Sequence, residues 1–218
     1  MAKILFMKYD FRKMKLLYLA SIVLFAPLGY VMAYSTENIL SAYSYMLLIS
    51  TIVPTSLFTY EQRADCGFDL MLPAKEGDRI AGRYLISAVT IIYEFLLGTV
   101  IAFILTKTTQ AVWFDISVIF KFFVGGILIC MSIELCILYI IGRGINPQVR
   151  SVMIMLPNMI IWGIAYAAIN IFSDKLSSAK GIFSNFEMLG NIVLIVSLIF
   201  YIASMYAVSY THLTLPTI

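Results

Sequence analysis

The hydrophobic residues of this 218-residue chain gather into long, nearly uninterrupted runs that are separated by short polar stretches. A helix needs about 20 apolar residues to cross the hydrocarbon core of a bilayer, where each backbone polar group must be paired within the protein. Six runs reach that length. The pattern therefore predicts an all-α, polytopic membrane protein with about six transmembrane helices. The predicted spans are Leu16–Tyr34, Ile39–Tyr60, Leu85–Thr106, Val118–Ile141, Val152–Phe172 and Met188–Tyr210.

The Lys and Arg residues are divided unequally between the two sides that these spans define. With the N-terminus inside, 11 of the 15 lie on the inner side and 4 on the outer side. Cytoplasmic loops carry the excess of positive charge, so both termini and the Glu61–Tyr84 connection are predicted to be cytoplasmic, in a multi-pass protein of the cell membrane. The inner residues are Lys3, Lys8, Arg12, Lys13, Lys15, Arg63, Lys75, Arg79, Arg83, Arg143 and Arg150; the outer ones are Lys107, Lys121, Lys175 and Lys180.

The two ends of the chain flank a single transmembrane domain, which is predicted to occupy residues 1–210. Residues 1–15 are basic and combine an apolar stripe with a basic row at helical spacing. Two interpretations stay open: a helix lying on the anionic inner leaflet, or a simple positively charged flank. Residues 211–218 are expected to be a short tail, and the string SYTHLTLPTI resembles a translated sequencing-adapter remnant rather than native sequence. The stripe is Ile4, Met7, Phe11 and Met14; the row is Lys8, Arg12 and Lys15.

The composition agrees with a membrane location and excludes several kinds of site. Hydrophobic residues make up 61% of the chain and charged residues 12%, against about 45–50% and 25% in soluble domains, so the apolar excess must face lipid. A net charge of +3 gives no basis for binding nucleic acid. Three cysteines and one histidine, without paired CxxC motifs, support neither a disulfide framework nor a metal site. No cofactor and no catalytic site are expected.

The cytoplasmic connection between the second and third spans is the most distinctive polar segment. It reads YEQRADCGFDLMLPAKEGDRIAGRYL from Tyr60 to Leu85. Proline is favoured in the first turn of a helix, so Pro73 is expected to begin a short polar helix, Ala74–Tyr84, that leads into the third span. Gly77 and Gly82 weaken this helix in isolation by about 1 kcal/mol each, so it needs either a partner surface or the membrane interface to hold it.

This connection resembles that of the ABC-2-type transporter permeases, especially the small six-helix bacterial members. The resemblance rests on Glu61, on Leu72-Pro73, on Ile80 and on the Arg83-Tyr84-Leu85 string, together with the number of spans and the basic N-terminus. It implies the membrane subunit of an ATP-driven exporter, which forms half of the translocation path beside a second permease copy. It also implies that the connection docks on a separate ATP-binding cassette ATPase subunit. The implied coupling residues are Glu61, Leu72, Pro73, Lys75, Arg79, Arg83 and Tyr84. The chain has no GxxxxGK[ST] phosphate-binding loop of its own, in agreement with a non-enzymatic subunit.

Two carboxylates fall inside predicted spans, Glu94 in the third and Glu134 in the fourth. An ionised carboxylate at that depth costs about 2.5 kcal/mol or more on insertion scales, so such residues usually face the bundle interior. They are either contacts for a substrate or proton, or protonated groups that hydrogen-bond Ser, Thr or Tyr on neighbouring helices. The first reading supports an alternative to the exporter: an ion-coupled secondary transporter or another polytopic membrane protein. An intramembrane enzyme ranks last, because no nucleophile or metal set accompanies the two carboxylates.

Overall fold

The computed structural model describes residues 2–36, 39–43, 75–109, 115–141 and 183–214, together with isolated residues 56, 146, 148–149, 152–153, 156, 159–160 and 163. All long elements in this part of the chain are helices, as the hydrophobic runs predict. Four of them are long and apolar enough to cross a membrane, judged by length and composition. Most of the predicted second and fifth spans lies outside the described residues, so the count of six spans stays a prediction.

The N-terminal stretch forms α1 (Ala2–Ala20), a π-helical turn η1 (Ser21–Phe25) and α2 (Ala26–Thr36) without interruption. The basic segment 1–15 and the first predicted span therefore share one helical path, and no break separates them. The π turn precedes Pro27. Proline has no backbone N–H to donate, and its ring crowds the backbone carbonyl one turn earlier in the helix. The Ala26 N–H reaches back five residues to the Ser21 carbonyl, which widens the helix just ahead of this proline.

The other long helices are α5 (Glu76–Thr108), α6 (Ile116–Ile141) and α8 (Phe183–Thr214). Each contains one predicted span, and α5 is longer than predicted, because the segment expected to be a separate short helix is its first part. No boundary separates Tyr84 from Leu85. Residues 211–214 of the predicted tail continue α8, and residues 215–218 lie outside the described part.

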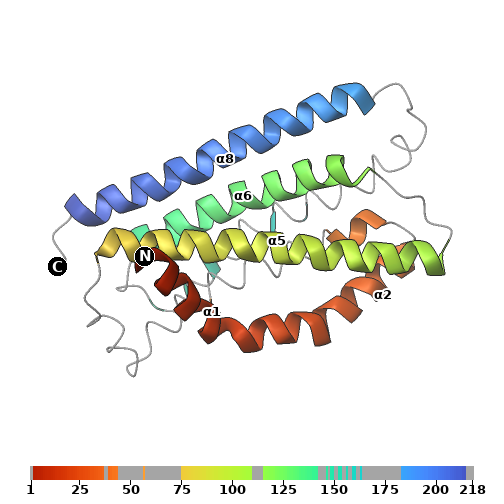
Figure 1. Ribbon diagram of the computed structural model, residues 1–218, viewed down its shortest axis with the longest axis horizontal. Coiled ribbons are helices and arrows are strands. Elements are labelled where there is room, and N and C mark those ends of the chain that lie inside the picture. Colours follow the sequence, from red (N-terminus) through yellow and green to blue (C-terminus); the bar gives the residue numbers. More distant parts are fainter. Residues whose placement is uncertain are drawn as a thin grey trace.

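The helices lie side by side in the order α8, α6, α5 and then the α1–α2 stretch (Figure 1). The beginnings of α1 and α5 and the ends of α6 and α8 gather at one end of the molecule, and the opposite helix ends gather at the other. Eight of the ten Lys and Arg residues in the described part belong to the first end. They are Lys3, Lys8, Arg12, Lys13, Lys15, Lys75, Arg79 and Arg83, against Lys107 and Lys121 at the second.

Helices α6 and α8 pack closely because glycines face the contact. A Cβ added at Gly125 would lie 2.9 Å from Val193 Cγ1, and one at Gly190 would lie 3.1 Å from the Lys121 Cβ. Small residues of this kind let helix backbones approach within membranes. Near the beginnings of these two helices, Lys121 Nζ meets Glu187 Oε1 at 3.1 Å.

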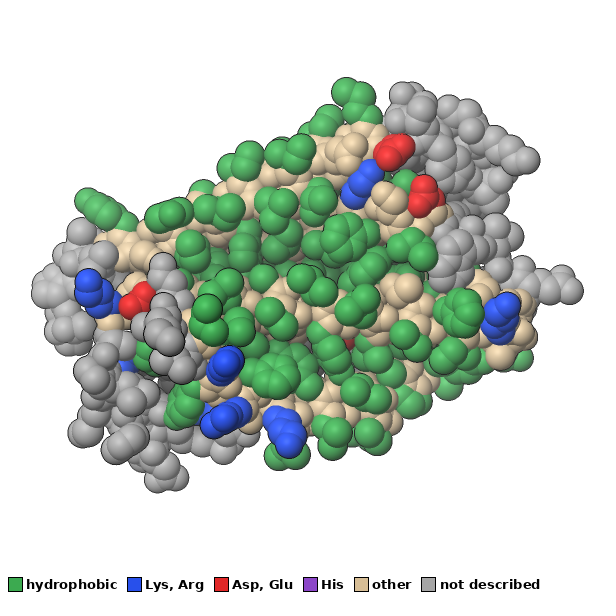
Figure 2. Space-filling model, in the orientation of Figure 1, with side chains coloured by type: hydrophobic (Ala, Val, Ile, Leu, Met, Phe, Trp, Pro, Cys, Tyr) green, Lys and Arg blue, Asp and Glu red, His purple; other side chains and the backbone are tan. Residues whose placement is uncertain are grey.

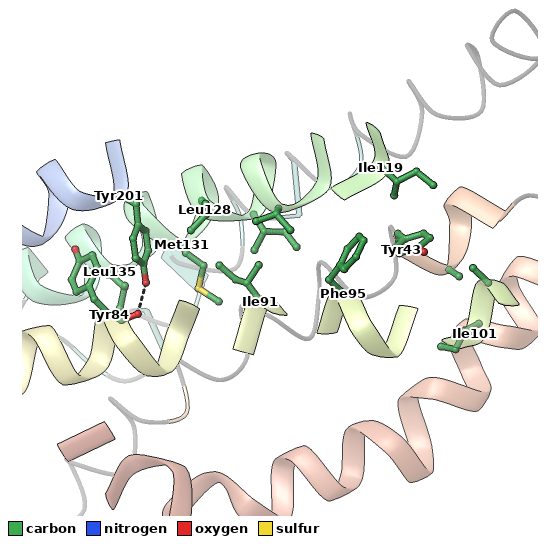
Figure 3. Close-up of a cluster of buried hydrophobic side chains, with 14 of the residues drawn as sticks. Tyr43, Tyr84, Ile91, Phe95, Ile101, Ile119, Leu128, Met131, Leu135 and Tyr201 are labelled. Carbon is green, nitrogen blue, oxygen red and sulfur yellow. Dashed lines mark hydrogen bonds between the residues drawn. The ribbon is translucent and has the colours of Figure 1, made fainter. Parts of the chain in front are cut away.

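The hydrophobic core fills the space between α5 and its neighbours. Tyr43, Phe95 and Ile119 pack toward one end of it, and Ile91, Met131 and Leu135 toward the other (Figure 3). Outside this core, large apolar side chains stay exposed: Leu16 is 77% exposed on α1 and Ile199 63% exposed on α8. Hydrophobic side chains cover most of the visible face, and most of the charged ones fall into a left-hand and a right-hand group (Figure 2). Such a surface suits lipid or another membrane helix.

Candidate functional site

The first turns of α5 carry the described members of the predicted coupling segment, while Glu61, Leu72 and Pro73 lie outside the described residues. Lys75 precedes the helix in an extended conformation and is exposed. Its carbonyl accepts the Asp78 N–H at 2.9 Å and the Arg79 N–H at 3.4 Å, which closes the first turn. The Arg79 guanidinium lies 5.8 Å from the centre of the Phe6 ring, so the start of α5 rests against the N-terminal helix.

Arg83 and Tyr84 point into the protein. They are 7% and 2% exposed, and the Arg83 guanidinium lies 5.9 Å from the centre of the Tyr139 ring of α6. The Tyr201 hydroxyl of α8 donates to the Tyr84 carbonyl at 2.6 Å, and the two rings meet edge to face with centroids 5.0 Å apart (Figure 3). These two residues therefore join α5 to α6 and α8, whereas Lys75 faces outward.

Gly77 is the second residue of α5, a position where a backbone N–H needs no partner within the helix. A Cβ added there meets nothing within 4 Å. A proline at this position is compatible with the helix start, so Gly77 is not the point at which a substitution would break the segment. Ala81, one turn further and 7% exposed, lies in the helix interior.

Glu94 lies near the centre of α5, about 27 Å along the axis from Glu76 and about 21 Å from Thr108. It is 0% exposed, and neither carboxylate oxygen has a hydrogen-bond partner among the described residues. It lies one turn from Thr90 on the same face of α5, and Thr90 contacts Tyr18 of α1. The alternative in which neighbouring hydroxyls bond this carboxyl is thus not observed in the described part.

The hydroxyls near Glu94 are directed toward backbone carbonyls. Thr90 Oγ1 donates to the Ile86 carbonyl at 2.8 Å, so the Tyr18 hydroxyl, 2.6 Å from Thr90, must be the donor of that pair. Such side-chain bonds satisfy polar groups that would be costly to leave unpaired in an apolar environment.

The π turn completes this polar network. Ser21 Oγ donates to the Tyr18 carbonyl at 2.8 Å, and the Tyr93 hydroxyl donates to the same carbonyl at 3.0 Å. The Tyr18 and Tyr93 rings meet edge to face, with centroids 5.2 Å apart. These hydroxyls therefore bond within the network, and none of the described residues donates a hydrogen bond to the Glu94 carboxyl. π turns occur frequently at functional sites.

Glu134 lies on α6 and is 2% exposed. Cys130 lies one turn away on the same helix. The two carboxylates thus have different surroundings, because Glu94 lies one turn from Thr90, which contacts α1.

The network residues Tyr18, Ser21, Thr90 and Tyr93 were not predicted from the sequence. A partial signal was present, since Thr90 and Glu94 are four residues apart and share one face of a helix. The N-terminal helical stretch, which supplies Tyr18 and Ser21, carried no comparable pattern, because single tyrosines and serines are common in membrane helices.

The comparisons with known proteins bear on the chain as a whole. No curated protein and no solved structure matches it. Residues 5–212 match the family described as ABC-2 family transporter protein, and this range includes every predicted span and all four long helices. The chain therefore belongs to the ABC-2 family of transporter proteins and is a multi-pass membrane component of a transporter.

Proposed function

We propose that this chain is the membrane subunit of an ATP-driven exporter and couples to a separate ATP-binding cassette ATPase subunit. Two permease copies, identical or related, would form the translocation path, each contributing half. Membership of the ABC-2 family supports the transporter role, and the absence of a phosphate-binding loop in the sequence supports a partner that hydrolyses ATP.

The observation that carries the proposal is the continuity of α5. Its 33 residues extend over about 50 Å, about 20 Å more than the hydrocarbon core of a bilayer. The polar first turns therefore project beyond the apolar part as an unbroken extension of a membrane helix. A force applied by an ATPase near Lys75 would act directly on that helix, since no flexible joint intervenes.

Contacts at Arg83 and Tyr84 would pass the movement on. Tyr84 is held to α8 by the Tyr201 hydroxyl, and Arg83 packs on Tyr139 of α6. Displacing the start of α5 would thus displace α6 and α8 together. Rigid-body movement of packed helices of this kind is a common way to change access to a binding site.

The proposed orientation places the basic helix ends in the cytoplasm, where an ATPase is found. Cysteines placed at Lys75 and Lys107 in a cysteine-free background test it, since both positions are exposed and lie at opposite ends of α5. We expect a membrane-impermeant maleimide to label position 107 in intact cells and position 75 after permeabilisation alone. The reverse pattern would contradict the orientation.

Coupling is tested by proline substitutions at two positions of α5. Ala81→Pro removes an interior backbone hydrogen bond and costs about 3 kcal/mol, whereas Gly77→Pro falls in the first turn and leaves the helix intact. We expect Ala81→Pro to abolish transport-linked ATP hydrolysis in membranes that contain the permease and its proposed ATPase subunit. Gly77→Pro should retain most of that activity.

Two controls accompany this comparison. Protease protection establishes that each variant is inserted, and Ala81→Gly, which costs about 1 kcal/mol, should give an intermediate loss. Co-purification of wild-type permease with the ATPase should yield at least four chains. Unchanged coupling in correctly inserted Ala81→Pro protein, or a permease that transports unaided as a monomer, would refute the proposal.

A further inference from the structure

Among the described buried polar groups, Glu94 differs from the rest in its setting. It lies at the centre of a long membrane helix, it is fully buried, and neither of its oxygens is hydrogen-bonded. Carboxylates within membrane spans are costly and usually mark a substrate or ion path. The cost is highest when no donor or counter-charge is present, so an ionised carboxylate in this position requires a partner that the described residues do not supply.

The surroundings of Glu94 are suited to a cation. Glu94 lies one turn from Thr90, which accepts the Tyr18 hydroxyl, and next in sequence to Tyr93, whose hydroxyl donates to a backbone carbonyl. The Tyr18 and Tyr93 rings meet edge to face, and the Phe11 ring stacks on Tyr18 at 5.1 Å. Aromatic rings next to a carboxylate are the usual means of recognising organic ammonium groups.

The helices α1 and α5 are joined next to Glu94. The Tyr18 carbonyl accepts hydrogen bonds from the Ser21 and Tyr93 hydroxyls, and the bond from Tyr93 holds α1 against α5 one residue away from Glu94.

We propose that the α1–α5 contact around Glu94 is a binding site for the cationic head of an organic ammonium cargo. The inference rests on the transport function proposed above and assigns a substrate class to it. The Glu94 carboxylate supplies the counter-charge, and the Tyr18 and Tyr93 rings contact the apolar part of the head group. Because Glu94 is fully buried here, the structure represents the site in a closed form, which separation of α1 from α5 would open.

The test uses tritiated dodecyltrimethylammonium and purified permease in lipid nanodiscs, with binding to empty nanodiscs subtracted. We expect saturable binding that dodecanol, a neutral amphiphile with the same tail, does not displace. Glu94→Gln removes the charge with little change in shape and should weaken binding roughly tenfold or more, as expected for loss of a charge-assisted contact. Glu94→Asp keeps the charge and should retain part of the affinity. Glu134→Gln is the matched control and should bind as the wild type does.

A second measurement needs no variant. Dicyclohexylcarbodiimide modifies carboxyl groups in apolar surroundings, and mass spectrometry locates the adduct. Dodecyltrimethylammonium should protect Glu94 from modification, and dodecanol should not. Equal affinity of wild type and Glu94→Gln, or modification of Glu94 that the cation does not reduce, would overturn the inference. Co-purification of the permease with its ATPase subunit is measured in a separate preparation, so that failure of the proposed function is distinguished from failure of the cation site.

Discussion

The contact between α6 and α8 allows a stability prediction from two adjacent glycines. A Cβ at Gly125 would lie 2.9 Å from Val193 Cγ1 and 3.3 Å from Ser197 Oγ, whereas a Cβ at Gly126 meets nothing within 4 Å. The optimal separation of two carbon atoms is about 3.5–4.0 Å, so alanine at 125 forces the helices or the Val193 side chain to move. Valine has one strongly preferred rotamer in a helix, which leaves it little freedom to yield.

The magnitude follows from comparing the two alanine variants. Each gains the same helix propensity, about 0.5–1 kcal/mol relative to glycine, so this contribution cancels between them. Overpacking a tight contact costs about 1–3 kcal/mol. We therefore expect the free energy of unfolding of Gly125→Ala to be about 1–3 kcal/mol below that of Gly126→Ala.

The assay is reversible unfolding of the purified protein by SDS in mixed micelles, followed by circular dichroism. A double-mutant cycle identifies the responsible atom, because Val193→Ala deletes the Cγ1 methyl that the new Cβ would meet. In that background, Gly125→Ala should lose most of its penalty. If Gly125→Ala is as stable as Gly126→Ala, the inferred close packing of α6 and α8 is wrong. If the penalty persists in Val193→Ala, the Val193 methyl is not its cause.

Two smaller effects follow from single contacts. Tyr201→Phe removes the hydrogen bond to the Tyr84 carbonyl and keeps the ring, so it should lower the free energy of unfolding by about 0.5–1.5 kcal/mol. Tyr206→Phe, at a side chain 67% exposed, should change it far less, and equal effects of the two would contradict the role given to this bond. Glu187→Gln breaks the ion pair with Lys121, and because Glu187 is 60% exposed the loss should be at most about 1 kcal/mol and vanish in 1 M salt. A larger, salt-independent loss in the same SDS titration would mean that the pair is more than a surface contact.

The hydrophobic pattern predicts the positions of four spans well, because the length of an apolar run and its flanking charges are set by the bilayer. It fails at Tyr84, where polarity changes but the helix continues. Polarity reports which environment a residue faces, while continuity of a helix depends on the backbone. Here Gly82 is accommodated inside α5, since its cost of about 1 kcal/mol is small beside the packing of the neighbouring Arg83 and Tyr84.

Only part of the candidate site could be predicted from the sequence. The position of Glu94 within an apolar run fixes its depth in the membrane, and Glu94 was predicted as a candidate residue for that reason. Its surroundings come from α1, whose Tyr18 is bonded to Thr90 across 72 residues of chain. Contacts at that separation follow from how helices pack, which no local spacing encodes. In the same way, Pro27 predicts a kink in the helix, but it does not predict that a π turn forms just ahead of it.

The π turn also sets the rotational phase of the helix that follows it. Each residue of an α-helix advances the side chain by about 100°, so an unbroken α-helix would leave Ala33 about 100° away from the direction of Met14. A π turn takes up one extra residue and cancels that offset. Gly29 and Ala33 therefore return to the buried side shared by Met14 and Tyr18, and both Met14 and Ala33 are almost fully enclosed. The widened turn thus keeps a single face of this long N-terminal path aligned with α5 on both sides of Pro27.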